Sequence, residues 1–492
     1  MLFKIKDILH KGDETNLENK FLCFEHDYNL LNKEINGFKY WQHIRFELFR
    51  EIQLISGLIN ENQKSSSRSY KKMIQSVISK NHLLYNQSVD LLVMGHYRYI
   101  KNKNNKYESI YTTPILKEIN YKYLLIEPFS EENIHRDLEL ESTYYYTDLQ
   151  LMVNVFIKFR LYKFLSLSKL KQESKQLAST INKEFNILFN EDKLYQLMLK
   201  SYIRWIFGKK YFLKLLSKLN PKVILEVVGY TPYNLILNEV AKSQKIPTIE
   251  LQHGLIGEKH IAYNFIKKEN YETFPDIILT YSDYWKKNTR FPISDYNVIS
   301  TGFPYLENIV NEFNCKREKE NKMYNILFIS QWSIGKQLSE FAVELYNYFE
   351  VNNINQYKIH YHLHPEEQLE GNSQYERLMQ YKDKINIIEK KHQSLYESFS
   401  MCDIQVGVYS TGLYEGLAFG LDTFILNIEG SDMVKDLVNH NYATYIDTVE
   451  QLFLYLINGE NRCSNDNDFW SKDSLNNIFS VIEKVMKKER VD

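Results

Sequence analysis

Residues 410–420, with the sequence STGLYEGLAFG, lie between two apolar runs at 404–408 and 423–426. An apolar run that stops at small hydroxyl and glycine residues, followed by a short helical segment and a second apolar run, predicts strand, turn, helix and strand. Such a turn presents unpaired backbone N–H groups at the positive end of a helix, where a phosphate binds well. With His364 and Pro365 upstream, the stretch predicts a nucleotide site.

The alternation of short apolar runs with helical segments extends on both sides of this stretch. Helical segments rich in lysine and leucine occupy 148–219, and the alternation resumes after Pro221. Strands that alternate with helices are typical of doubly wound parallel sheets, so we predict an α/β fold with two Rossmann-like domains. The candidate strands outside the 404–426 unit lie at 89–95, 123–126, 223–229, 248–251, 277–280, 298–300, 326–330, 358–363 and 385–388.

Changes in composition along the chain suggest where the domains begin and end. The charged run 311–323 is the best linker candidate, and apolar residues at helical spacing in 475–488 predict an amphipathic helix. The predicted parts are a helical N-terminal extension at 1–80, a Rossmann-like domain at 81–310, a second at 311–470, and a C-terminal helix at 471–492.

Composition bounds the class of protein. A chain of 492 residues with 44% hydrophobic residues can bury large cores, and a net charge of −1 gives no reason to expect a nucleic-acid partner. The chain shows no apolar run of membrane-spanning length, and its first 17 residues lack the layout of a secretory signal. We therefore expect a cytoplasmic protein with peripheral membrane contact at most. Scattered cysteines fit a reducing compartment better than a disulfide framework or a zinc site; they are Cys23, Cys315, Cys402 and Cys463.

Ligands of open α/β sheets bind beyond the carboxyl ends of the strands, so the residues after each strand are the first candidates. His253 follows the candidate strand 248–251, and an imidazole accepts a proton near pH 7 while Gly254 lets a substrate approach. We predict His253 as a catalytic base; the alternative is that it only caps backbone groups. Glu258 is the second candidate base, and its alternative is a solvated surface carboxylate.

His364 and Pro365 follow the candidate strand 358–363, and His364 is predicted to donate to a phosphate or ribose oxygen. His360, His362 and His364 alternate along that strand and would share one face, which raises a metal site as an alternative. The lack of a nearby cysteine or matched carboxylate disfavours metal, and a purely structural set is a third alternative.

The opening turn itself offers several donor-binding residues. Ser410 is a natural N-cap, and Thr411 and Gly412 place backbone donors at the positive end of the helix. Glu415, one turn in, is predicted to accept from ribose hydroxyls; the alternative is that it only complements the helix dipole. Gln331, in the loop after the first strand of the second domain, is expected beside the diphosphate.

Together, residues 252–254, His364 with Pro365, and 410–415 resemble motifs of bacterial surface-polysaccharide glycosyltransferases of the GT-B fold. The group includes polysialyltransferases, Kdo transferases and, more distantly, glycerophosphotransferases of teichoic-acid synthesis. The resemblance covers mainly 222–430 and none of the first 80 residues. In that group the histidine-proline and serine motifs bind the donor nucleotide. The acidic pair before a glycine that activates the acceptor in polysialyltransferases has no clear copy here.

The resemblance implies a glycosyltransferase that moves a sugar from a nucleotide-sugar donor to a growing bacterial capsule or lipopolysaccharide. Two domains would face each other across a cleft, the first holding a glycan or lipid-linked glycan acceptor and the second the donor. It implies no metal ion, no cofactor and no nucleic acid, a last helix that returns to the first domain, and peripheral contact with the inner face of the cell membrane. The alternatives are a sugar-nucleotide 2-epimerase, a polyol-phosphate transferase and a non-catalytic polysaccharide-assembly protein.

Overall fold

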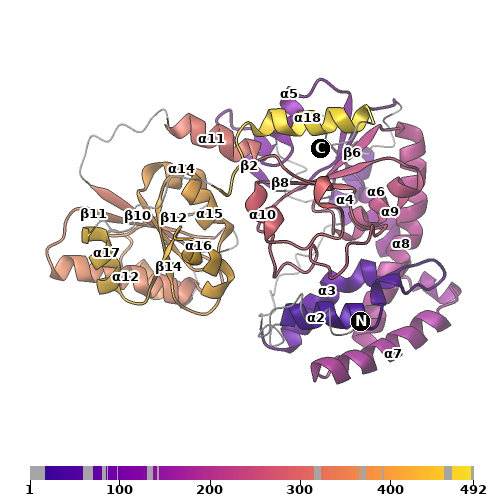
Figure 1. Cartoon of the computed structure of the whole chain (residues 1–492), viewed down its shortest axis with the longest axis horizontal. Coiled ribbons are helices and arrows are strands. Elements are labelled where there is room, and N and C mark those ends of the chain that lie inside the picture. Colours follow the sequence, from indigo (N-terminus) through magenta and orange to yellow (C-terminus); the bar gives the residue numbers. More distant parts are fainter. Residues whose placement is uncertain are drawn as a thin grey trace. The chain divides into compact units, whose positions relative to one another are not determined.

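The computed structural model describes residues 17–58, 70–79, 85, 87–96, 98–129, 137–140, 143–314, 323–364, 367, 373–389, 393–458 and 468–488. Over these residues the chain forms two compact units (Figure 1). Unit 1 is Met1–Pro304 together with Asp473–Asp492, and unit 2 is Tyr305–Lys472. Each unit has its own parallel sheet, so the predicted α/β class with two Rossmann-like units is confirmed.

Within the described residues of unit 1, seven parallel strands form one sheet in the order β5-β4-β1-β6-β7-β8-β9. Along the chain, β1, β4 and β5 follow one another toward one edge of the sheet, and β6, β7, β8 and β9 follow one another toward the other edge. The strand order therefore reverses between β1 and β6, which makes that point the topological switch. The bounds are β1 Leu91–Met94, β4 Tyr123–Glu127, β5 Thr143–Tyr145, β6 Val223–Val227, β7 Thr248–Leu251, β8 Ile277–Thr280 and β9 Val298–Ser300.

The long helix α8 organises the helices of unit 1, because it contacts α3, α6, α7 and α9. It begins where the side chain of Asn190 accepts from the backbone N–H of Lys193 at 3.1 Å. A Cβ on its Gly208 would come within 2.9 Å of Ile236 in α9, so this glycine allows the two helices to approach closely. The helices are α2 Leu17–Asp27, α3 Tyr40–Ile55, α4 Tyr70–Ser79, α5 Thr113–Glu118, α6 Thr147–Lys158, α7 Ser168–Phe185, α8 Glu191–Leu219, α9 Pro232–Ser243, α10 Asp283–Lys287 and α18 Ser474–Met486.

A buried ion pair ties the N-terminal helices to the rest of unit 1. Arg45 of α3 donates through Nε to Glu25 of α2 at 2.7 Å, and both side chains are almost fully buried. The same guanidinium donates to the carbonyl oxygens of Ile261 at 2.6 Å and Asn264 at 3.0 Å. Since a buried charge needs such partners, α2 and α3 are fastened to the loop that follows β7.

Helix α18 belongs to unit 1 although unit 2 separates it from the rest of that unit in the sequence. Ile478 and Ile482 are buried, the helix contacts β6, and Asn477 donates to the carbonyl oxygen of Thr301 at 3.2 Å. Figure 1 shows α18, in yellow, among the elements of unit 1.

Within the described residues of unit 2, six parallel strands form a sheet in the order β12-β11-β10-β13-β14-β15. Here the strand order reverses between β10 and β13. The core is the apolar sheet and the buried faces of α12 and α17. The strands are β10 Tyr324–Ile329, β11 Tyr357–His362, β12 Asn386–Ile388, β13 Ile404–Gly407, β14 Asp422–Leu426 and β15 Thr444–Ile446; the helices are α11 Pro304–Asn314, α12 Gly335–Val351, α13 Glu376–Met379, α14 Leu395–Met401, α15 Thr411–Ala418, α16 Lys435–Asn439 and α17 Val449–Asn458.

The predicted linker 311–323 is wrong at its start, because α11 runs through residue 314. Its apolar residues Leu306, Ile309 and Val310 continue at helical spacing to Phe313, which carries the helix past the predicted boundary. Residues 315–322 lie outside the described residues. The small antiparallel pair β2 Tyr99–Lys101 and β3 Tyr107–Ser109 was not predicted. Among the described residues, no helix combines the length and the hydropathy needed to span a bilayer.

Candidate functional site

The carboxyl ends of the unit 1 strands open onto a cavity of about 770 Å³. Gly95 and His96, which follow β1, line it together with Val228 and Tyr230, which follow β6, and His253, which follows β7. The cavity therefore lies at the switch point, where open parallel sheets bind their ligands. Its volume falls within the range of small-molecule sites, roughly 300 to 1,000 Å³.

The imidazole of His253 lies between two tyrosine hydroxyls. Its Nε2 is 3.2 Å from the hydroxyl of Tyr230, and its Nδ1 is 3.3 Å from that of Tyr263. The Tyr263 hydroxyl donates its single proton to Oε1 of Glu250 at 2.5 Å, so its oxygen is left to accept from Nδ1–H. We infer that His253 carries its proton on Nδ1 and offers Nε2 as a proton acceptor.

The surroundings of His253 suit a base. Burial lowers its pKa well below the usual value, and the nearby charges of His260, His96 and Arg98 lower the pKa further. The ring is therefore neutral at pH 7. Oε1 of Glu250 lies 3.9 Å from Nδ1, so an ionised Glu250 stabilises the imidazolium that forms when Nε2 takes a proton.

Glu250 belongs to a pair of buried carboxyl groups on neighbouring strands. The register of β6 and β7 places Glu226 opposite Glu250, and both are almost fully buried. Burial raises the pKa of Glu250 to about 7, and burial together with the charge of Glu250 raises the pKa of Glu226 well above its usual value. A Cβ on Gly229 would meet Glu250 at 2.5 Å and Glu226 at 2.8 Å, so any side chain there would have to displace the two carboxyl groups.

The raised pKa of Glu226 predicts a pH-dependent stability change. A carboxyl whose pKa is higher in the folded state stabilises the fold below its ordinary pKa, and this contribution is lost as the pH rises through the folded pKa. The amide of Glu226→Gln can still accept from Asn238, now at 2.8 Å from Oε1, without the cost of a buried charge. We expect its free energy of unfolding, relative to wild type, to be higher at pH 8 than at pH 4.

Glu239→Gln is the matched control for that measurement by urea denaturation. Burial raises the pKa of Glu239, but contacts with His43 and Lys209 outweigh it and lower the pKa to about 2. A carboxyl with a lowered pKa stabilises the fold above its ordinary pKa, so Glu239→Gln should lose stability at pH 8. The same shift in both variants would contradict the assignment for Glu226.

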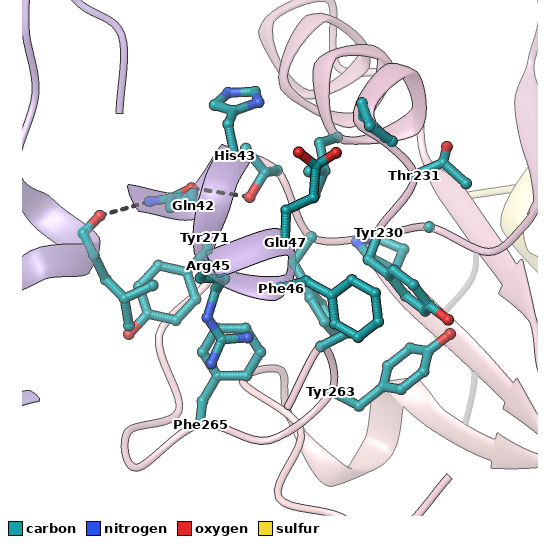
Figure 2. Close-up of a pocket in the computed structure, with 18 of the residues that line it drawn as sticks. Gln42, His43, Arg45, Phe46, Glu47, Tyr230, Thr231, Tyr263, Phe265 and Tyr271 are labelled. Carbon is teal, nitrogen blue, oxygen red and sulfur yellow. Dashed lines mark hydrogen bonds between the residues drawn. The ribbon is translucent and has the colours of Figure 1, made fainter. Parts of the chain in front are cut away.

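Helix α3 closes the other side of the His253 network. A second cavity, of about 270 Å³, lies between α3 and the loops that follow β6 and β7 (Figure 2). Glu250 is among the residues that line it. The ring of Phe46 on α3 lies 4.7 Å from that of Tyr230 and is stacked on His260 at 5.8 Å between centroids. The first 80 residues, for which the sequence predicted no site residue, thus contribute to the wall of the site.

Gln331 and Ser410 lie at the corresponding switch point of unit 2. Gln331 follows β10, and Ser410 caps α15 by accepting from the backbone N–H of Gly412 at 3.1 Å. A Cβ on Gly412 would come 3.6 Å from Ile329, the last residue of β10. The hydroxyl groups of Ser333 and Tyr409 also contact each other, so the loop after β10 and the turn before α15 are neighbours.

Thr411 begins α15 and is partly exposed, whereas Glu415 is only 5% exposed. Gly412, Glu415 and Gly416 share one face of the helix by their spacing. A Cβ on Gly416 would overlap the side chain of Gln405 in β13, so this face is packed on the sheet. Glu415 is therefore on the sheet-facing side of α15 rather than on its solvent side.

His364 is half-buried two residues after the end of β11, and its backbone N–H donates to Oε2 of Glu367 at 2.6 Å. Oε1 of Glu367 accepts from Tyr375 at 2.5 Å and from Ser330 at 3.2 Å. Glu367 thus connects the loops after β10 and β11. Pro365 lies outside the described residues.

The metal alternative finds no support in the strand β11. His360 contacts Asn325 through Nε2 and Asn386 through Nδ1, both at 2.9 Å, and Nδ1 of His362 contacts Ser398 at 3.1 Å. These rings are held by amide and hydroxyl groups of neighbouring elements. Within the part of the chain that the structure describes, no three or more His, Cys, Asp or Glu residues are grouped to hold a metal ion.

The two predicted bases occupy different environments. Glu258 is exposed and lines neither cavity, whereas His253 lines the larger one and is 14% exposed. Sequence reasoning missed Glu226 and Glu250 as site residues. The available signal was a carboxylate inside each of two apolar strands, VILEV and TIEL, where a charged residue is rarely buried without a partner.

The chain resembles known proteins in backbone structure but not detectably in sequence. No family model and no curated protein matches the chain. A UDP-GlcNAc 2-epimerase of Methanocaldococcus jannaschii, in complex with UDP-GlcNAc and UDP, is 13% identical, with 80% of this chain and 99% of that chain covered and a TM-score of 0.43. The wall teichoic acid polymerase TagF is 12% identical, with 91% and 98% covered and a TM-score of 0.45.

The MurG protein of Acinetobacter baumannii is 13% identical, with 59% of this chain and 79% of that chain covered and a TM-score of 0.37. Likenesses at such identities and TM-scores carry no functional argument. What the site can do therefore follows from its own geometry: a neutral imidazole backed by a carboxyl group at a cavity in unit 1, and a helix N-terminus at the switch point of unit 2.

Proposed function

We propose that this chain is a glycosyltransferase that moves a sugar from a nucleotide-sugar donor held by unit 2 to a hydroxyl group of a glycan held in the unit 1 cavity. The observation that carries the proposal is the environment of His253. Its Nε2 is oriented as a proton acceptor, and both His253 and the neighbouring Tyr230 line a cavity large enough for a sugar. This cavity belongs to unit 1, and the proposed nucleotide turn belongs to unit 2.

In the proposed reaction the acceptor hydroxyl gives its proton to Nε2 of His253 while its oxygen bonds to the anomeric carbon of the donor sugar. The bond from that carbon to the nucleoside diphosphate breaks, and the diphosphate leaves with the electron pair. Glu250 stabilises the imidazolium across Tyr263. The N-terminus of α15 at Ser410, Thr411 and Gly412, together with His364, stabilises the charge on the leaving group.

Two further residues of unit 2 are proposed as contacts of the donor nucleotide. Gln331 lies in the loop expected beside the diphosphate. The predicted ribose contact of Glu415 would need its side chain to leave the sheet-facing side of α15, where it is only 5% exposed. The resemblance of residues 252–254, His364 and 410–415 to surface-polysaccharide glycosyltransferases supports a capsule or lipopolysaccharide glycan as acceptor, used at the inner face of the cell membrane.

Product analysis tests the proposal. The protein is incubated with a panel of nucleotide sugars, with and without bacterial surface glycans, and the products are separated by mass spectrometry. A transferase releases the nucleotide and lengthens the glycan. An altered nucleotide sugar without acceptor identifies a 2-epimerase, and an added mass that itself contains phosphorus identifies a polyol-phosphate transferase. No product under any condition, with partner binding kept in a His253→Ala, His364→Ala double variant, identifies an assembly protein.

His364→Ala should weaken donor binding and turnover about tenfold to a hundredfold, since a hydrogen bond to a charged phosphate contributes roughly 1.5 to 3 kcal/mol. His440→Ala is the matched control, because His440 is an exposed histidine of the same unit whose Nδ1 lies against the carbonyl oxygen of Asp436 in the preceding helix. Donor affinity is measured by calorimetry and turnover by release of the nucleotide. Wild-type affinity and turnover in a folded His364→Ala protein would remove His364 from the donor site.

A further inference from the structure

The end of α6 and the short 3-10 helix η5, Leu161–Phe164, carry an exposed apolar surface in unit 1. Met152, Val155 and Phe159 are three and four residues apart and all exposed, so they form one stripe along α6 and its C-cap. Phe159 is 66% exposed, and Phe164 in η5 is 88% exposed. Large aromatic side chains are usually buried, so an exposed group of this kind indicates an interaction surface.

An ordered turn joins α6 to η5 and carries the two phenylalanines. Arg160 in this turn has a φ of 54°, in the left-handed region that residues other than glycine rarely adopt. Its backbone N–H donates to the carbonyl oxygen of Ile157 at 3.0 Å, and its own carbonyl oxygen accepts from the N–H of Lys163 at 3.1 Å. Phe159 and Phe164 therefore flank a turn that hydrogen bonds fix on both sides.

The same segment is basic and lacks acidic side chains. Residues 149–172 include five lysines and arginines and neither aspartate nor glutamate. Arg160 and Lys163, beside the two phenylalanines, are both exposed. Within the described residues, neither side chain has an ion-pair or hydrogen-bond partner. Two cations therefore face solvent between the exposed aromatic rings.

The acidic residues that flank this segment in the sequence are engaged elsewhere. Asp148, at the start of α6, accepts from the hydroxyl of Tyr211 in α8 at 3.0 Å. Glu173, in α7, accepts from the hydroxyl of Tyr40 in α3 at 2.6 Å and lies 3.6 Å from Lys33. These contacts direct both carboxylates toward other helices, so the turn keeps its positive charge.

Apolar and basic side chains in one place fit the surface of an anionic bilayer. Aromatic and aliphatic side chains bury themselves at the boundary between headgroups and acyl chains, and lysine and arginine attract anionic headgroups. A soluble polyanion would attract the cations but leave the phenylalanine rings in water. The combination therefore favours lipid over a soluble polyanion.

Helix α6 lies between this surface and the unit 1 cavity. Gln150, Val153 and Asn154 line the cavity, and by helical spacing they lie on the opposite side of α6 from Met152 and Val155. A helix with its side chains is roughly 10 Å across. An acceptor anchored in a bilayer on one side of α6 would therefore be close to the cavity on the other side.

We propose that Phe159, Arg160, Lys163 and Phe164, with the exposed stripe of α6, bind the surface of an anionic phospholipid bilayer. The proposal deepens the proposed function, since it names the surface through which the transferase reaches the membrane. Vesicle binding needs neither a donor nor an acceptor, so the two proposals can fail separately.

Sedimentation of the full chain with unilamellar vesicles tests the proposal. We expect stronger binding to vesicles of equal parts phosphatidylglycerol and phosphatidylcholine than to phosphatidylcholine alone. The double variant Arg160→Gln, Lys163→Gln should lose about twenty-five-fold in partitioning, since each cation near an anionic surface contributes about fivefold. Phe164→Ala should lose about tenfold, because its ring no longer moves from water into the bilayer. Circular dichroism checks that the variants fold.

Tyr296→Ala and the double variant Lys382→Gln, Lys384→Gln are the matched controls. Tyr296 is a 76% exposed aromatic residue of unit 1 that follows Asp295. The two lysines are exposed residues of unit 2 on either side of Asp383. Both controls should bind vesicles as the wild type does. A loss in them as large as in Phe164→Ala would overturn the assignment of the surface.

Equal binding to the two kinds of vesicle, or wild-type binding in both patch variants, would also overturn the proposal. So would the absence of vesicle binding, and a dimer that Phe164→Ala dissociates would then assign the surface to a second copy of the chain. Transfer to a soluble glycan should persist in Phe164→Ala. Failure of transfer in a wild-type protein that still binds vesicles would refute the proposed function and leave this surface in place.

Discussion

His253→Ala should lose about a hundredfold to ten-thousandfold in turnover, the range that general-base assistance typically supplies. Nε2 of this ring is the proton acceptor that the Tyr263 and Glu250 contacts leave available at the unit 1 cavity. Donor-nucleotide affinity should remain at the wild-type level, because the proposed donor residues belong to unit 2. Turnover at saturating donor and the donor dissociation constant by calorimetry check both halves of the expectation.

Glu258→Gln is the control for His253→Ala, since Glu258 is exposed and lines neither cavity. It should turn over substrate as the wild type does. A large fall in turnover confined to Glu258→Gln would refute His253 as the base. Loss of nucleotide binding in His253→Ala would show that the donor binds in unit 1 instead.

Glu250→Gln should reduce turnover on the order of a hundredfold and also change the pH profile. Because burial raises the pKa of Glu250 to about 7, its carboxylate form becomes populated as the pH rises through that value. If the ionised carboxylate stabilises the imidazolium, wild-type turnover rises with pH around 7 and then levels. Glutamine accepts from Tyr263 but cannot ionise, so this rise should disappear.

Glu127→Gln is the matched variant for the pH profile. Glu127 is another buried glutamate at the end of a unit 1 strand, with its pKa raised by burial to about 8, and it accepts from Tyr99 at 2.7 Å. Both of its carboxyl oxygens accept from Tyr99, and within the described residues neither is hydrogen-bonded to His253. The rise near pH 7 should persist in Glu127→Gln. If turnover of Glu250→Gln also rises near pH 7, a group other than Glu250 causes the rise.

The central strands of both sheets were predictable from the sequence because each is a short, largely apolar and largely buried run. Strands β5 and β15 were not, since each carries threonine and tyrosine, whereas the equally short edge strands β9 and β12 each have two adjacent aliphatic residues and were predicted. All four lie at an edge of their sheet, where one neighbour decides the pairing. The amino-acid pattern of so short an edge strand holds little information about its partner.

The sequence allowed us to predict that His253 lies at the end of a strand. It did not allow us to predict which side chains contact its ring. Glu226 and Glu250 become a pair through the register of two strands, and Tyr263 returns to Glu250 from a later loop. Arg45 reaches the same loop from α3, far away in the sequence. Spacing along one chain does not specify contacts of this kind, because they depend on how separate elements pack.

The return of α18 to unit 1 has a consequence for biosynthesis. Unit 2 is one uninterrupted segment, Tyr305–Lys472, whereas unit 1 needs a piece from each side of it. A ribosome therefore releases every residue of unit 2 before it releases α18, the helix that contacts β6 and buries Ile478 and Ile482. On the nascent chain, unit 2 can reach its final protease resistance while unit 1 still exposes an apolar surface, which makes unit 1 the part that a chaperone would have to shield.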